Sequence, residues 1–425
     1  MTKIAIPYGL GSQCIDIPEA RLNAVLESRI AAMPPASDED AEVLRALSEP
    51  IGSLPLRELA KGKRRVTIIA SDHTRPVPSK RILPHMISEI HAGSPDASIT
   101  ILIATGCHRE TTKRELIAKL GETVYGETNV IVHDCDDEEN LVTLGTLPSG
   151  GVCRVSRHAL DCDLLVSEGF IEPHFFAGFS GGRKSVLPGI AARKTVVANH
   201  CAEFIASENA RTGKLDGNPI HRDMVWAARS AKLSFIVNVV LSGDKRIVRA
   251  FAGDAVQAHE AGCAFLNTLC GVNRAEADIV ISSNGGYPLD QNAYQAFKGM
   301  TAAEASVRQG GVIILFAECA DGVGGEAFLR QLADEPDGEK TMRLFLSRPP
   351  EETEPDQWQT QIFLRVLSRA SVVFVSKLDD ETVRKLHMIP AHSFDEALRA
   401  ADAILGSETG SITVIPDGVS VIVRG

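Results

Sequence analysis

Residues Glu168–His200 read EGFIEPHFFAGFSGGRKSVLPGIAARKTVVANH, and we expect the fold to be organised around this stretch. It begins as the end of a buried apolar run, Asp163–Gly169 (DLLVSEG), which predicts a strand. It then passes into a glycine-rich loop that also carries two histidines and a lysine. A buried strand that runs into such a loop is typical of the ligand-binding edge of an open α/β sheet.

The glycine loop resembles a phosphate-binding loop without matching it. Glycine tolerates positive φ and leaves backbone N–H groups accessible, so this loop is able to surround an anion. The pattern comes close to G-x-x-x-x-G-K-[ST], but Arg183 stands between the last glycine and Lys184. Two alternatives stay open at this point, an ordinary surface turn and the nucleotide loop of a kinase or ATPase. No evident Walker-B strand supports the second.

The length and composition favour two α/β domains. The chain has 425 residues, 35 glycines, 5% aromatic residues and continuous Val/Ile runs, which indicates mainly parallel sheets flanked by helices. We expect an N-terminal cofactor-binding and catalytic domain at 1–270, joined by 410–425 as a β-hairpin, and a C-terminal substrate-closing domain at 275–405. The active site is expected in the cleft between them.

Charge and cysteine usage exclude several classes of protein. The net charge of −11 argues against a nucleic-acid or membrane partner, so a substrate anion must be met by local cations. The nine cysteines include no C-x-x-C pair, which indicates reduced thiols. Met1–Gln13 lacks the apolar core of a signal peptide, and no run approaches the ~18 apolar residues of a membrane span. We therefore expect a cytoplasmic protein.

Two further strand ends are predicted to converge on the same sheet edge. Arg65–Asp72 (RVTIIASD) runs into a loop with Thr74 and Arg75, and Ala97–Arg109 (ASITILIATGCHR) delivers His108. Because ligands gather at the carboxyl ends of parallel strands, these side chains are candidates for the site. In the second half, Tyr294 and Lys298 are predicted to share a helix face, with Gln295 beside it, that could bind a carboxylate, although such spacing also suits a solvated face.

The histidines indicate acid–base chemistry rather than a zinc site. No H-E-x-x-H pattern is present, so a zinc hydrolase is not supported. His108, His174 and His200 all fall in predicted loops beside glycine, proline or a strand end. A pair of imidazoles flanking a lysine-bound cofactor would suit proton transfer on both faces of a small substrate.

Several long motifs together resemble the nickel-pincer-nucleotide-dependent lactate racemase family. The match runs through most of the chain, in order and in both halves. The motifs are SDHTRPVP (71–78), TGCHR (105–109), EPHFFAGFSGGRKSVLPGI (172–190), ANH (198–200), NGGYPLDQNAYQAFKGM (284–300) and DQWQ (356–359).

The resemblance implies a cofactor of the Ni(II)-pyridinium-3,5-bisthiocarboxylate mononucleotide type. In the family's pattern Lys184 tethers this nickel-pincer nucleotide and His200 ligates the nickel, while His108 and His174 are the acid–base pair. The residues implied to bind the cofactor are Asp72, His73, Thr74, Arg75, Ser180, Gly181, Gly182, Lys184, Ser185 and His200. Those implied to bind the substrate are Arg75, Tyr294, Gln295, Lys298 and Trp358.

The resemblance also implies a racemase of a small 2-hydroxy acid that works by hydride transfer through a 2-keto acid, with cofactor-synthesis proteins as partners. The apolar walls expected from Tyr294 and Trp358 favour lactate over a diacid. Malate is the alternative if further cations, such as Arg109 or Arg365, line the pocket.

Overall fold

Two six-stranded sheets form the core of the computed structural model, which describes residues 1–335 and 337–425. Their strand orders are β13-β12-β9-β4-β5-β6 and β18-β17-β16-β15-β19-β3. Neighbouring strands run parallel except for β13, which is antiparallel to β12. The predicted α/β class with parallel sheets and flanking helices is confirmed.

The first sheet comprises β4 (Arg65–Ser71), β5 (Ser98–Ala104), β6 (Asn129–Val132), β9 (Leu164–Phe170), β12 (Leu233–Leu241) and β13 (Ile247–Gly253). Its helices are α1 (Glu39–Ser48), α2 (Leu56–Ala60), α3 (Ser79–Gly93), α4 (Lys113–Leu120), α5 (Glu122–Glu127), α6 (Arg193–Asn199), α7 (Ala202–Ala206), α8 (Pro219–Ser230) and α9 (Gln257–Cys270). Short hairpins join β7 (Leu141–Thr146) to β8 (Val152–Ser156) and β10 (Pro173–His174) to β11 (Gly178–Phe179).

The second sheet comprises β3 (Leu22–Val25), β15 (Ala277–Ser283), β16 (Val307–Phe316), β17 (Ala370–Val375), β18 (Ile389–Ala391) and β19 (Ile412–Ile415). Its helices are α10 (Ala293–Ala296), α11 (Met300–Ser306), α12 (Glu326–Ala333), α13 (Gly338–Ser347), α14 (Gln357–Leu367), α15 (Asp380–Lys385) and α16 (Phe394–Leu405). A hairpin of β1 (Thr2–Tyr8) and β2 (Gly11–Ile17) packs on this sheet.

Both faces of the first sheet are buried, which explains its unbroken apolar strands. Successive side chains of a strand point to opposite faces, so β4 contributes to two cores. Ile68 packs with the helices α1–α4, and its neighbour Ile69 packs with α7, α8 and the 176–190 segment on the other face. Strands of this kind are recognisable from sequence because burial on both sides leaves no polar alternation.

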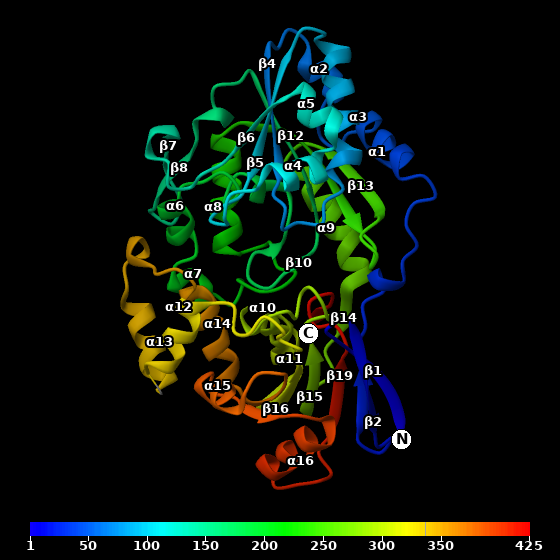
Figure 1. The fold of residues 1–425 in the computed structure, drawn as a ribbon, viewed down its shortest axis with the longest axis vertical. Coiled ribbons are helices and arrows are strands. Elements are labelled where there is room, and N and C mark those ends of the chain that lie inside the picture. The colour runs from blue at the N-terminus through cyan, green and yellow to red at the C-terminus, as the bar shows by residue number, and fades with distance from the viewer. Residues whose placement is uncertain (336) are drawn as a thin grey trace.

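The N-terminal segment belongs to the second domain, which corrects the predicted boundary of 1–270. Ile4, Ile6, Ile15 and Ile17 of the β1–β2 hairpin are buried against β15, β16 and α16, and β3 is the edge strand of the second sheet. The chain enters the first domain only after β3 and leaves it again after α9 (Figure 1). A hairpin with one apolar face requires a sheet to cover it, but its sequence does not say which sheet.

The predicted hairpin at Ser411–Arg424 is wrong. Its first half, β19, pairs in parallel with β15 and β3 inside the second sheet. Its second half, β20 (Ile422–Arg424), pairs in parallel with β14 (Gly271–Asn273), and Ile422 packs on the cluster that contains Ile171 and Phe251. Both strands therefore have distant partners, which a local pattern does not reveal.

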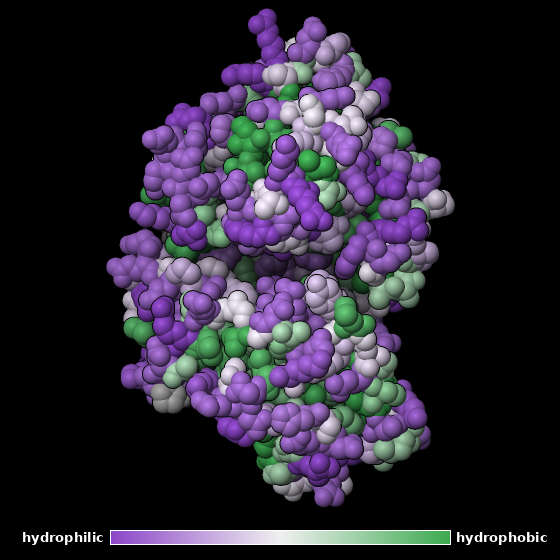
Figure 2. Space-filling view, in the orientation of Figure 1, coloured by the Kyte–Doolittle hydropathy of each residue, from purple (hydrophilic) through white to green (hydrophobic). Residues whose placement is uncertain are grey.

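The carboxyl ends of β4, β5 and β9 face the second domain. The surface is hollowed between the two domains in the view of Figure 2. Helix α14 crosses this boundary and packs on α7, where Gln361 Nε2 donates to the carbonyl of Ala202 (2.8 Å). Among the described residues, no helix combines the length and apolar character that crossing a bilayer requires.

Candidate functional site

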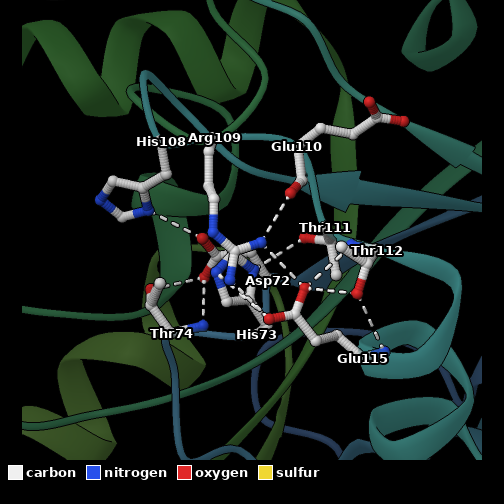
Figure 3. A network of polar contacts seen from close by, with 9 residues as sticks. All are labelled: Asp72, His73, Thr74, His108, Arg109, Glu110, Thr111, Thr112 and Glu115. Carbon is white, nitrogen blue, oxygen red and sulfur yellow. Dashed lines mark hydrogen bonds and ion pairs between the residues drawn. The ribbon is translucent and has the colours of Figure 1, made fainter.

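Asp72 orders the loop that follows β4. Its buried carboxylate accepts hydrogen bonds from the backbone N–H (3.2 Å) and hydroxyl (2.7 Å) of Thr74, and it lies 2.7 Å from Nδ1 of His108 (Figure 3). Burial opposes ionisation, but the bonds from His108 and Thr74 and the charge of Arg75 hold the pKa of Asp72 below its usual value. Because an ionised carboxylate only accepts, Nδ1 of His108 carries a proton, and in the neutral ring Nε2 is the acceptor.

The ring of His73 ties two loops together. Its Nδ1 lies 3.0 Å from the hydroxyl of Thr111, and its Nε2 lies 4.0 Å from Glu115 (Figure 3). Glu115 also completes a capping box with Thr112 and forms a bidentate pair with Arg109 (2.9 and 2.5 Å). The ring of His73 is thus directed into this network, and its contact with a cofactor stays a prediction.

His174 and Lys184 meet on the loop after β9. The Nζ of Lys184 lies 3.3 Å from Nε2 of His174, whose Nδ1 accepts from the backbone N–H of Ala177 (3.3 Å). Burial is the largest cause that holds the pKa of His174 well below its usual value, followed by the charges of Lys184 and Lys298. Burial and the charge of Arg183 likewise hold the pKa of Lys184 well below its usual value. Burial and the neighbouring charges thus both favour the neutral forms of His174 and Lys184.

The Gly181-Gly182 pair is required because the chain approaches the core closely. Both residues have positive φ, +79° and +54°. A Cβ on Gly181 would lie 2.6 Å from Oδ1 of Asn238, and one on Gly182 would lie 2.6 Å from the ring of His259. The N–H of Gly182 already donates to Asn238 (2.7 Å). The N–H of Gly182 is thus committed to β12, which corrects the expectation that it helps to cradle a phosphate.

The two serines of this loop are also engaged inside the protein. Ser180 Oγ donates to Glu172 (3.3 Å), and Ser185 Oγ donates to the carbonyl of Gly182 (2.9 Å). A nucleotide loop needs its backbone N–H groups for phosphates and its hydroxyl for Mg²⁺. The geometry therefore opposes the kinase or ATPase alternative, and it leaves Lys184 as the loop side chain that meets other predicted site residues.

His200 presents a lone pair beside the aromatic wall of the site. It follows α6 directly, and its Nδ1 donates to the carbonyl of Val196 (2.8 Å), so the neutral ring has no proton on Nε2. The rings of Phe176 and Trp358 pack at its sides, each with a centroid 5.1 Å away. Burial, then the charge of Lys184, lowers the pKa of His200 to about 3. A neutral imidazole with a fixed tautomer is what a metal ligand requires.

The second domain contributes a lysine and two neighbouring side chains from α10 and the turn that follows it. Lys298 donates to Gln295 Oε1, and its Nζ lies 5.7 Å from the ring centroid of Phe175 in the first domain. The hydroxyl of Tyr294 donates to Asp356 (2.9 Å), and burial followed by this carboxylate raises the pKa of Tyr294. Of the three predicted neighbours, Lys298 thus contacts Gln295, while Tyr294, expected on the same face as Lys298, bonds to Asp356 instead.

Three basic side chains gather here without carboxylate partners. Among the described residues, no ion pair within 4.0 Å involves Arg75, Lys184 or Lys298. Burial, then the charge of Arg75, lowers the pKa of Lys298 to about 8, and Glu172 is the acidic neighbour that opposes this shift. Arg75 is exposed, whereas Lys184 and Lys298 are partly buried. Basic groups that lack carboxylate partners favour a bound anion.

The structure thus joins the predicted residues in two groups. One holds Asp72, Thr74 and His108 on two strand ends, and the other holds the residues around Lys184 from both domains. Sequence reasoning missed that Asp72 orients His108, and it missed the walls formed by Phe175 and Phe176. The two phenylalanines stand directly after His174, which is the signal that was available.

The chain matches two family models that cover most of its length. One is the lactate racemase N-terminal domain at residues 8–213, and the other is the lactate racemase C-terminal domain at residues 272–423. The second begins close to the point where the chain leaves the first sheet for good.

Named relatives match from end to end. The chain is 51% identical over 425 residues to the lactate racemase of Thermoanaerobacterium thermosaccharolyticum and 49% identical to that of Lactiplantibacillus plantarum, covering 100% of each chain. The solved lactate racemase apoprotein from T. thermosaccharolyticum superposes with a TM-score of 0.96 and 50% identity over both whole chains. A crystal structure of a Thermotoga maritima protein shares the fold at a TM-score of 0.65 and 18% identity, covering 91% of this chain and 98% of that one.

Proposed function

The chain belongs to the lactate racemase family, whose curated members are isomerases, and on that premise we propose that it interconverts the two enantiomers of lactate. One structural observation supports the proposal in addition to the similarity to known lactate racemases. A neutral imidazole, His174, lies among cations that lack carboxylate partners, while a second imidazole, His108, is held by Asp72 with a free acceptor nitrogen. An anionic substrate with an exchangeable hydroxyl proton fits this combination.

The residues present fit a nickel-pincer nucleotide. His200 offers an unprotonated Nε2 in a buried aromatic setting, and Lys184 offers an amine whose pKa is lowered by burial and is therefore suited to a covalent tether. When bound, such a group supplies a reversible acceptor for a hydride. The expectation that the glycine loop holds its phosphate lacks support at Gly182, whose N–H is already bonded.

Hydride transfer explains why such a site needs no strong base to remove the proton on the α-carbon. Removing the α-proton of a 2-hydroxy acid would place a carbanion next to a carboxylate, which stabilises it poorly. Removing the hydroxyl proton instead allows the α-hydrogen to leave with its electron pair. His108 Nε2 is the oriented acceptor for that hydroxyl proton, and His174 serves the opposite enantiomer. Arg75 and Lys298 hold the carboxylate while the planar keto acid turns.

The charge arrangement favours lactate over a diacid such as malate. The two arginines considered as extra pocket cations are each committed to a carboxylate of their own domain. Arg109 pairs with Glu115 (2.9 and 2.5 Å), and Arg365 pairs with Glu304 through two bonds of 2.7 Å. A second substrate carboxylate would therefore be buried without a cation, which costs several kcal/mol.

The test is racemisation by protein produced together with the cofactor-synthesis proteins. Single enantiomers of lactate, malate, 2-hydroxyglutarate and glycerate are incubated with this holoenzyme and separated by chiral chromatography. Lactate is expected to racemise fastest. If malate racemises faster, the argument from Arg109 and Arg365 fails while the hydride mechanism stands. If no 2-hydroxy acid changes configuration, the proposed function is wrong.

Asp72→Asn is expected to lower kcat by about 10²–10⁴ with little change in fold stability. The amide can donate to Nδ1 of His108 and so shift the ring proton to Nε2, where it blocks proton acceptance. The tautomer is read by ¹⁵N NMR of labelled histidine, and kcat by the same chromatographic assay. An active variant with an unchanged tautomer would show that Asp72 does not orient His108.

The Michaelis constant for lactate is expected to rise as pH increases through about 8, the pKa to which burial and Arg75 lower Lys298. Below this pH the amine is charged and binds the carboxylate, and above it the competent fraction falls by roughly tenfold per pH unit. Lys298→Arg keeps its charge and is the matched control. The Michaelis constant is obtained from initial rates between about pH 6 and about pH 10. A wild-type Michaelis constant that does not change over this range contradicts the assignment of Lys298 as a carboxylate-binding residue.

A further inference from the structure

Two cysteines that the proposed reaction does not use lie close together beside the loop of His108. The neighbouring strands β5 and β6 run in parallel, and the loops that follow them are joined by the hydroxyl of Thr105, which donates to the carbonyl of His133 (2.7 Å). Each cysteine stands two residues beyond this bond, Cys107 on one loop and Cys135 on the other. This placement brings the two thiols together, and they form a hydrogen bond.

Cys107 is part of the tight turn that carries His108. The N–H of His108 donates to the carbonyl of Thr105 (3.0 Å), so Gly106 and Cys107 are the central residues of this turn. The ring of His108 is held by Asp72 at 2.7 Å. A shift of the Cys107 backbone therefore acts on the contact that orients the proposed proton acceptor.

The surroundings give the two thiols different reactivities. Cys107 is half-buried, whereas Cys135 is buried. The hydrogen bond from Cys135 lowers the pKa of Cys107, burial opposes this shift, and the charge of Arg193 adds to it. The same hydrogen bond, followed by burial, raises the pKa of Cys135. An accessible, more acidic thiol beside a buried one is typical of a cysteine pair in which the first reacts and the second resolves the product.

We propose that Cys107 and Cys135 form an oxidation site, at which a peroxide converts the two thiols into a disulfide that reversibly displaces His108. The thiolate sulfur of Cys107 attacks one oxygen of hydrogen peroxide, the O–O bond breaks, and hydroxide leaves and takes up the proton that the thiol released. The sulfur of Cys135 then attacks the sulfenic sulfur, the S–S bond forms, and the S–O bond breaks to release water with the Cys135 proton. The two thiols lose two electrons, and the peroxide is reduced to water.

Disulfide formation has to move the turn of Cys107. A disulfide brings the two sulfurs to about 2.05 Å, which is much closer than two hydrogen-bonded thiols. The loop of Cys135 is held by the N–H of Arg193, which donates to the carbonyl of Cys135 (3.0 Å). Closing the gap therefore shifts the turn relative to this loop and disturbs the position of His108. Only the resulting loss of activity rests on the proposed function, because the disulfide itself needs no substrate.

The experiment treats wild-type holoenzyme with a few equivalents of hydrogen peroxide, alkylates the remaining thiols and maps disulfides by peptide mass spectrometry. We expect a linked pair of peptides that contain Cys107 and Cys135. Racemisation of lactate should fall by at least about tenfold, since a general acid or base supplies about 10²–10⁴. Dithiothreitol should restore both the free thiols and the rate.

Three variants show whether this cysteine pair causes the loss. Cys107→Ser and Cys135→Ser each remove one partner, so their treated and untreated rates should be equal. Cys14→Ser is the matched control, because Cys14 is an exposed thiol on β2 of the second domain, and it should respond as the wild type does. In ¹⁵N NMR of labelled histidine, the His108 signals should shift on oxidation of the wild type and stay unchanged in the first two variants.

Wild-type protein that forms no disulfide between Cys107 and Cys135 overturns the proposal. An equal loss of rate in the wild type and in both pair variants also overturns it, because oxidation then acts elsewhere. So does a disulfide that leaves the rate and the His108 signals unchanged. If Cys107→Ser does not fold, a wild-type loss in Cys135→Ser overturns the proposal. If untreated holoenzyme does not racemise lactate, the proposed function fails, while disulfide mapping and the histidine spectrum still decide this proposal.

Discussion

Replacing either His108 or His174 by alanine is expected to lower kcat for lactate racemisation by about 10²–10⁴, while the protein keeps its nickel. Each ring accepts or donates one proton of the substrate hydroxyl in this proposal, and neither is placed as a metal ligand. The imidazole of His108 is held by Asp72 at 2.7 Å, and that of His174 is engaged by Lys184 and Ala177. Truncation removes the proton acceptor without touching His200.

Chiral chromatography gives the rates, and metal analysis of the same preparations gives the nickel content. The two variants should also differ in direction. Because one histidine serves each enantiomer, the first turnover from D- and from L-lactate is expected to be affected unequally in each variant. A loss of only twofold is too small for a general acid or base and would contradict the roles assigned here.

Replacing His200 by alanine is expected to remove bound nickel almost completely, together with activity. The Nε2 of His200 is the free donor atom, since Nδ1 is bonded to the carbonyl of Val196. Loss of a ligand, unlike loss of a proton acceptor, weakens metal binding directly. The mass added to Lys184 should persist, because the tether is made by a different residue.

Metal analysis and peptide mass spectrometry of co-produced protein test this separation. His392→Ala is the control histidine, since it lies on the second domain, where its ring contacts Asp380. Equal nickel loss in His200→Ala and in His174→Ala would reverse the assignment of ligand and base. Full nickel in His200→Ala would show that another group ligates the metal.

The sequence by itself determined the fold class and the place of the site. Strands such as Arg65–Ser71 and Leu164–Phe170 are buried on both faces, and their sequences are mainly apolar without the polar alternation of a half-exposed strand. The motifs that follow these strands identified the family, which the comparisons confirm. Because parallel strands end at one edge, their loops had to converge.

The tertiary structure alone decided which side chains meet. Asp72 and His108 are 36 residues apart in the sequence. The β1–β2 hairpin at the start of the chain packs on β15 and β16, which come from its second half. Such contacts leave no periodicity, because a local pattern records only that a residue is buried or polar, not its partner. The same holds for Arg183: the sequence shows it only as the residue that interrupts the phosphate-loop pattern, whereas in the structure its guanidinium is buried and donates to carbonyls of its own loop.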